Sequence, residues 1–262
     1  MTYVGPIADY DGRAVEGARR IGRAVAARLG TEPVIVGRPG IETDRWWQPD
    51  LAAAMPDLME LQAAHAAALE TYRPFIALPR CAAALATLPN VVRAEPDALV
   101  IWLDAHADLN TPASTTTGYI GGMILSAVMG WWDSGLGSGL TPDNLILGGT
   151  RALDPFEQGL VEEGEIKCAP GASLLEELDE LIGDRPVYVH LDCDLLEPGI
   201  VPTEYPVPGG LLLEDLAAVA SRLSRNRVIG VEIAEFEAPA QEDEIDGEGT
   251  GLLDALAPLL GV

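Results

Sequence analysis

Short runs of consecutive apolar residues recur along the chain and alternate with alanine- and leucine-rich stretches of helical length. Continuous apolar runs are typical of strands that are buried on both faces. The predicted strands are Val34–Val36, Pro74–Leu78, Ala98–Leu103, Asn144–Leu147, Val187–Leu191 and Val228–Ile233. The predicted helices lie near Gly12–Leu29, Asp50–Tyr72, Cys81–Leu88, Leu174–Ile182 and Glu214–Leu223. This alternation predicts an α/β fold with three α-β-α layers and a mainly parallel central sheet.

The length of 262 residues suits one large α/β domain or two small ones, and we predict a single domain over residues 1–262. No apolar run reaches the roughly 18–20 residues needed to cross a bilayer. The first residues lack the basic and apolar segments of a secretory signal. We therefore expect a cytoplasmic protein without a membrane partner. Gly135–Leu140 and the acidic Gln241–Gly251 segment are predicted to be loops.

The formal net charge of −25 argues against a nucleic-acid partner, because phosphate repels such a surface. The charge is compatible with a cationic substrate or with metal ions, and it could equally serve solubility alone. Three widely spaced cysteines without a CxxC motif do not predict a disulfide framework or a zinc finger.

Two of the predicted strands end in clusters of acidic residues. Asp104, His106 and Asp108 follow the strand at Ala98–Leu103, while Asp192 and Asp194 follow Val187–Leu191. Residues two apart on an extended chain share one face, and ligands of parallel α/β sheets bind beyond the carboxyl ends of the strands. Unrelated helix caps and surface acids remain the alternative interpretation.

Four carboxylates brought together would repel one another strongly unless a cation compensated them. Two divalent ions suit four carboxylates better than one ion does. Oxygen-rich ligation with one imidazole favours manganese over iron, cobalt or magnesium.

Several motifs, in matching order, resemble the arginase (ureohydrolase) family from about Pro74 to Pro239. The resemblance rests on Asp104–Pro112, on Asp192–Asp194 with the Pro208–Leu211 segment after it, and on Val231–Ile233. It implies an arginase-like fold, a guanidino C–N hydrolase and two metal ions. Asp104 and Asp192 would bridge the metals. The metal ligands implied are Cys81, Asp104, His106, Asp108, Asp192 and Asp194.

The resemblance also implies roles in catalysis and substrate binding. Asp108 would transfer a proton from the attacking water to the leaving amine, and Glu232 would pair with the substrate guanidinium. The positions that would hold the α-carboxylate and α-amino groups of a small guanidino amino acid are Asn110, Thr117, Asp154 and Glu157.

Two expected histidines are missing. Cys81 stands where the family has a metal-binding histidine, either as a thiolate ligand that weakens or retunes the first metal site or as a buried apolar residue. Gly121 stands at the position of the proton-shuttle histidine and is expected to leave room for an added substrate hydroxyl. His190 is predicted to orient a carboxylate or, alternatively, to bind metal directly.

These departures indicate either a degraded enzyme or one whose substrate makes the lost groups dispensable. The retained amino-acid positions favour a substrate with an α-carboxylate. A site with these positions but without the shuttle resembles the members of the family that hydrolyse Nω-hydroxy-L-arginine, a less basic guanidine. This resemblance implies hydrolysis to L-ornithine and hydroxyurea, in antibiotic biosynthesis. An ordinary arginase and a non-catalytic metal-binding protein are the alternatives, and the oligomeric state is left open.

Overall fold

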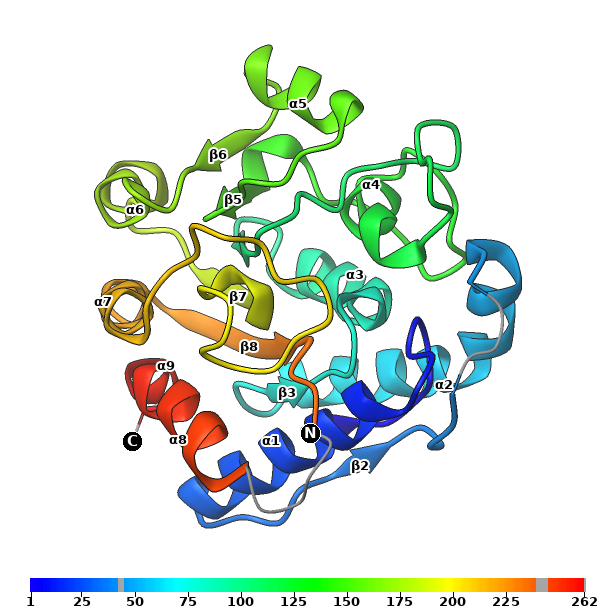
Figure 1. The fold of residues 1–262 in the computed structure, drawn as a ribbon, viewed down its shortest axis with the longest axis vertical. Coiled ribbons are helices and arrows are strands. Elements are labelled where there is room, and N and C mark those ends of the chain that lie inside the picture. Colours follow the sequence, from blue (N-terminus) through cyan, green and yellow to red (C-terminus); the bar gives the residue numbers. More distant parts are fainter. Residues whose placement is uncertain (42–44, 239–244, 262) are drawn as a thin grey trace.

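The computed structural model describes residues 1–41, 45–238 and 245–261. These residues form an eight-stranded, all-parallel sheet in the order β2-β1-β3-β8-β7-β4-β5-β6 (Figure 1). The strands are β1 (Thr2–Tyr3), β2 (Ile35–Val36), β3 (Phe75–Ala77), β4 (Leu99–Leu103), β5 (Leu145–Gly148), β6 (Lys167–Ala169), β7 (Val187–Asp192) and β8 (Val228–Ala234). The predicted parallel α/β fold is confirmed.

Helices cover both faces of the sheet. They are α1 (Arg13–Leu29), α2 (Trp47–Leu69), α3 (Ala84–Ala94), α4 (Ile124–Val128), α5 (Pro155–Glu162), α6 (Leu174–Ile182), α7 (Leu213–Leu223), α8 (Ile245–Ala255) and α9 (Ala257–Leu260). One apolar core lies between the sheet and α2, α3 and α4, and the other lies between the sheet and α1, α6, α7, α8 and α9 (Figure 1). No helix in the described ranges is long and apolar enough to span a membrane.

The six predicted strands all form, with ends shifted by at most one residue. β4 and β7 lie side by side at the centre, and every residue of both is buried, which explains the apolar sequence of β4 and the mostly apolar sequence of β7, where His190 and Asp192 are the exceptions. The loop at Gly135–Leu140 is confirmed. The loop predicted at Gln241–Gly251 is wrong from Ile245 onward, where α8 begins, and its earlier residues lie outside the described ranges.

Candidate metal centre and substrate pocket

A cavity of about 450 Å³ opens at the carboxyl end of the central strands. Its walls come from the ends of adjacent strands: Cys81 follows β3, Asp192 ends β7, Asp194 lies in the short helix after it, and Glu235 follows β8. His106 and Asp108 come from the segment after β4. The sheet order β3-β8-β7-β4 therefore gathers residues that are far apart in sequence, as the strand-end rule predicts.

The acidic residues of this cavity are packed closely and are almost fully buried. His106 Nδ1 lies 2.8 Å from Asp194 Oδ2, and the backbone N–H of His106 donates to Asp104 Oδ1 at 2.6 Å. The Cys81 thiol donates to Asp192 Oδ2 at 3.0 Å. The predicted cluster of Cys81, His106 and the four aspartates is thus brought together.

The electrostatics of the cluster suit a bound cation. Burial and repulsion from neighbouring carboxylates raise the pKa of Asp108 and of Asp192 well above the usual range, and raise that of Asp194 to about 6. Burial alone would lower the pKa of His106, but Asp104 and Asp194 raise it to about 11.

Three sets of side chains present ligand atoms within 4.8 Å of one another: Asp104, His106 and Asp194; Cys81, Asp192 and Glu235; and Cys81, Asp104 and His190. A divalent cation would offset the repulsion between the carboxylates, so these residues fit a metal centre.

The structure does not bring Glu232 to the cavity. This residue lies within β8 and is fully buried, with its carboxylate hydrogen-bonded to Thr87, Tyr188 and His190. Glu235, just beyond the strand end, lines the cavity instead. Its backbone is in the left-handed region, with φ of 63°, a strained conformation that clusters at functional sites. The strand-end rule, applied strictly, would have favoured Glu235 over a residue in the middle of the strand.

Glu235 is held firmly in place. Its Oε1 accepts from the backbone N–H of Cys81 at 2.8 Å, and its Oε2 accepts from Arg80 Nη1 at 2.7 Å. Arg80 is fully buried and also pairs with Glu237, Glu204 and Asp9. Burial raises the pKa of Glu235, although Arg80 opposes this shift.

The predicted amino-acid-binding residues all line the same cavity, on the side of α5. Asp154 and Thr117 are exposed, and Asn110 Nδ2 donates to Asp154 Oδ2 at 2.7 Å. Glu157 is buried and accepts from the backbone N–H groups of Leu109 and Asp154, so it braces the loop before α5. The cavity thus runs from an exposed polar side to a buried acidic side.

The space expected above Gly121 is filled by Tyr119. A Cβ atom placed on Gly121 would lie 2.2 Å from Cε1 of the Tyr119 ring, far inside van der Waals contact. The ring packs near Tyr205 and Tyr10, and burial raises the pKa of its hydroxyl well above the usual range. His106 is the only histidine among the described residues that line the cavity.

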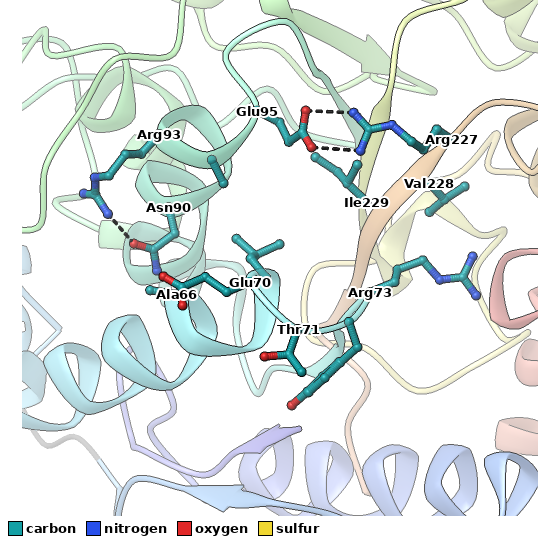
Figure 2. Close-up of a pocket in the computed structure, with 13 residues that line it drawn as sticks. Ala66, Glu70, Thr71, Arg73, Asn90, Arg93, Glu95, Arg227, Val228 and Ile229 are labelled. Carbon is teal, nitrogen blue, oxygen red and sulfur yellow. Dashed lines mark hydrogen bonds and ion pairs between the residues drawn. The ribbon is translucent and has the colours of Figure 1, made fainter.

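A second cavity, of about 670 Å³, lies at the other end of the sheet, where β8 begins (Figure 2). Its charged residues are Glu70, Arg73, Arg93, and the ion pair of Glu95 with Arg227 at 2.7 Å. None of its described lining residues is an aspartate, histidine or cysteine, so it offers no comparable metal site.

Comparisons with known proteins agree with this geometry. Residues 75–251 match the arginase family. The chain is 38% identical to the N(omega)-hydroxy-L-arginine amidinohydrolase of Streptomyces lavendulae, over 97% of this chain and 94% of that protein.

Among solved structures, the fold is similar to Entamoeba histolytica arginase in complex with L-ornithine, with a TM-score of 0.84, 22% identity, and coverage of 100% of this chain and 97% of that one. It is also similar to Bacillus subtilis arginase, with a TM-score of 0.82, 22% identity, and coverage of 100% and 98%.

Proposed function

The chain belongs to the arginase family, and on that premise we propose that it hydrolyses Nω-hydroxy-L-arginine to L-ornithine and hydroxyurea. The observation that carries the proposal is a single cavity that joins the acidic cluster to the amino-acid positions while lacking a histidine at Gly121. Its outer side presents the exposed Thr117 and Asp154 and the buried Asn110 to an amino acid, and its inner side presents carboxylates to a guanidine. A cytoplasmic setting in antibiotic biosynthesis remains part of the prediction.

The metal centre would be held by Asp104, Asp108 and Asp192, with His106 and Asp194 completing the second position and Cys81 the first. Divalent ions bound there would supply Lewis acidity and acidify water at neutral pH. The dominance of oxygen ligands favours manganese, whereas the sulfur of Cys81 favours a softer ion at the first position.

The chain's own residues would perform the remaining chemistry. Asp108 lines the cavity and would take a proton from the attacking water and return it to the leaving nitrogen of ornithine. We assign guanidine binding to Glu235 rather than Glu232, because only Glu235 faces the cavity. Arg80 would keep the Glu235 carboxylate oriented through their hydrogen bond.

A less basic guanidine is consistent with the absence of a proton-shuttle histidine at Gly121. Arginine has a pKa of about 12.5–13.8, and an N-hydroxyl group lowers this basicity and leaves the central carbon more open to attack. General acid–base groups typically contribute roughly 10²–10⁴-fold to the rate. Losing the histidine should therefore cost arginine turnover by about that factor, and cost the hydroxylated substrate less.

The test is kcat/KM for Nω-hydroxy-L-arginine, L-arginine and agmatine with manganese saturating. We expect hydroxyarginine to be preferred over arginine, and agmatine, which lacks the carboxylate, to be poorest. A preference for arginine would instead establish an ordinary arginase. No turnover of any of the three by metal-loaded protein would favour a binding protein.

A further inference from the structure

A buried chain of side chains runs beneath the metal site and ends at the sulfur of Cys81. His190 Nε2 lies 3.0 Å from Cys81 Sγ, and His190 Nδ1 lies 2.7 Å from Glu232 Oε1. His190 and Glu232 are register partners on β7 and β8, so the sheet itself fixes their separation. Their side chains are completely buried.

Glu232 is anchored on its other oxygen as well. Oε2 accepts hydrogen bonds from Thr87 Oγ1 and from the Tyr188 hydroxyl, both at 2.8 Å. With one oxygen held by these two donors, the other is directed at His190. A carboxylate accepts hydrogen bonds, so Nδ1 of His190 donates to Glu232. A metal-bound thiolate also only accepts, so Nε2 stabilises the sulfur when it too carries a proton and donates to Sγ.

The plane of the His190 ring is fixed independently. The ring stacks on Trp102, with centroids 3.5 Å apart and planes within 5°. Trp102 Nε1 in turn donates to Asp104 Oδ2 at 3.0 Å. Two hydrogen-bonded positions and a stacked face leave the imidazole one orientation, in which Nε2 points at Cys81.

We propose that His190 and Glu232 are positioning residues that hold Cys81 Sγ on the metal site, so that a cysteine can serve where the family resemblance places a histidine. The inference rests on the proposed metal-dependent function. The sulfur lies between His190 and Asp192, with a contact of 3.0 Å to each. Without His190, the small cysteine side chain would lose the contact that directs it toward the carboxylates.

Two other roles are open to His190, and each makes a different prediction. As a direct metal ligand, it would contribute affinity without affecting the sulfur. As a core residue only, it would affect stability without affecting the metal. In the positioning role, its removal alters the sulfur–metal bond itself, and outer contacts of this kind typically change metal affinity by about 10–100-fold.

Cobalt(II) is the probe, because thiolate bound to cobalt gives a charge-transfer absorption that carboxylate and imidazole do not give. Full-length protein is stripped with a chelator and titrated with Co²⁺ while this absorption and the dissociation constant are followed. The band should be present in the wild type, absent in Cys81→Ala and retained in Cys193→Ala. Cys193 is buried in the opposite core and serves as the thiol control.

His190→Gln should weaken or shift the band and raise the Kd for Co²⁺ by about 10–100-fold. A higher Kd with an intact band would make His190 a ligand, and an unchanged band and Kd would make it a core residue. Each of these results overturns the proposal, as does the absence of a band in the wild type.

If His190→Gln does not fold, the absorption and the Kd for Co²⁺ are measured instead for Glu232→Gln and Thr87→Val. Both should change in the same direction as expected for His190→Gln, but by less. Hydrolysis of Nω-hydroxy-L-arginine is measured separately on the wild type. Turnover without the expected change in the band leaves the proposed function standing and removes only the positioning role. If the band changes as expected but the wild type shows no turnover, the positioning role stands and the proposed function is refuted.

Discussion

Gly121 is the position where adding a single methyl group should be most informative. The Cβ of an alanine there would lie 2.2 Å from Cε1 and 2.8 Å from Cζ of Tyr119, where ordinary contact begins near 3.4 Å. Tyr119 cannot retreat freely, because its ring packs near Tyr205 and Tyr10. Overpacking of this kind typically costs about 1–3 kcal/mol, against a gain of about 0.4–1 kcal/mol from restricting the unfolded chain.

Gly121→Ala should therefore be destabilised by about 1–2 kcal/mol. For a chain of this size, about 1 kcal/mol corresponds to a Tm change of roughly 2–4 °C. Gly122→Ala is the matched control, since its Cβ would meet nothing within 4 Å and it lies in the same short helix, Ile120–Met123. Thermal unfolding of both variants, with saturating manganese, measures the difference.

The double variant Gly121→Ala with Tyr119→Ala isolates the contact. In the Tyr119→Ala background, Gly121→Ala should become neutral or stabilising, giving a coupling of about 1–3 kcal/mol. Equal Tm values for Gly121→Ala and Gly122→Ala would refute the steric argument. The same clash predicts that Gly121→His gains arginine turnover only when Tyr119 is also made small.

Further predictions concern the metal site, the substrate and pH. Cys81→Ala should weaken manganese binding at least about 10–100-fold and Cys81→His should tighten it, by calorimetric titration; equal affinities would make Cys81 a core residue only. Glu235→Gln should lower kcat/KM about 10–100-fold through loss of a charged hydrogen bond, and an unchanged value would remove it from the substrate site. Burial lowers the pKa of His65 to about 4 from 6.5. The unfolded state therefore takes up the proton first, and stability is lost as pH falls from about 6.5 to 4, by up to about 3 kcal/mol. In denaturant unfolding at different pH values, the free energy of unfolding of His65→Gln should fall less steeply toward acid pH than that of the wild type. The same dependence on pH in both proteins would contradict this prediction.

The sequence was most informative for segments in which every residue meets the same structural requirement, such as burial on both faces of the sheet. β4 and β7 are buried on both faces, and their apolar residues indicate this burial, although β7 also contains His190 and Asp192. β1 and β6 were missed because their sequences, Thr-Tyr and Lys-Cys-Ala, are not apolar runs, whereas the equally short β2 and β3 are apolar throughout. Helix α5, which positions Glu157, was also missed, although Asp154 and Glu157 form a capping box that the spacing could have revealed.

The remaining differences arise from side-chain packing that spacing cannot encode. Glu232 lies within β8 and Glu235 is the first residue after it, where the backbone turns into the left-handed region and the side chain lines the cavity. The absence of a side chain at Gly121 suggested open space, but Tyr119, two residues earlier, turns back to fill it. The strand-end rule could have identified Glu235, but the position of the Tyr119 ring depends on a side-chain rotation that residue type does not determine.

The order of strands in the sheet also bears on when the proposed metal centre can form. Asp104 follows β4 and Asp192 ends β7, and these strands become neighbours only after the intervening β5 and β6 have been synthesised and set aside. Contacts between segments that are far apart in the sequence form late in folding and lower the folding rate. During synthesis the aspartates after β4 therefore lack the aspartates of β7 until these two strands pair. Metal binding at the proposed centre would therefore require that β4 and β7 have already paired.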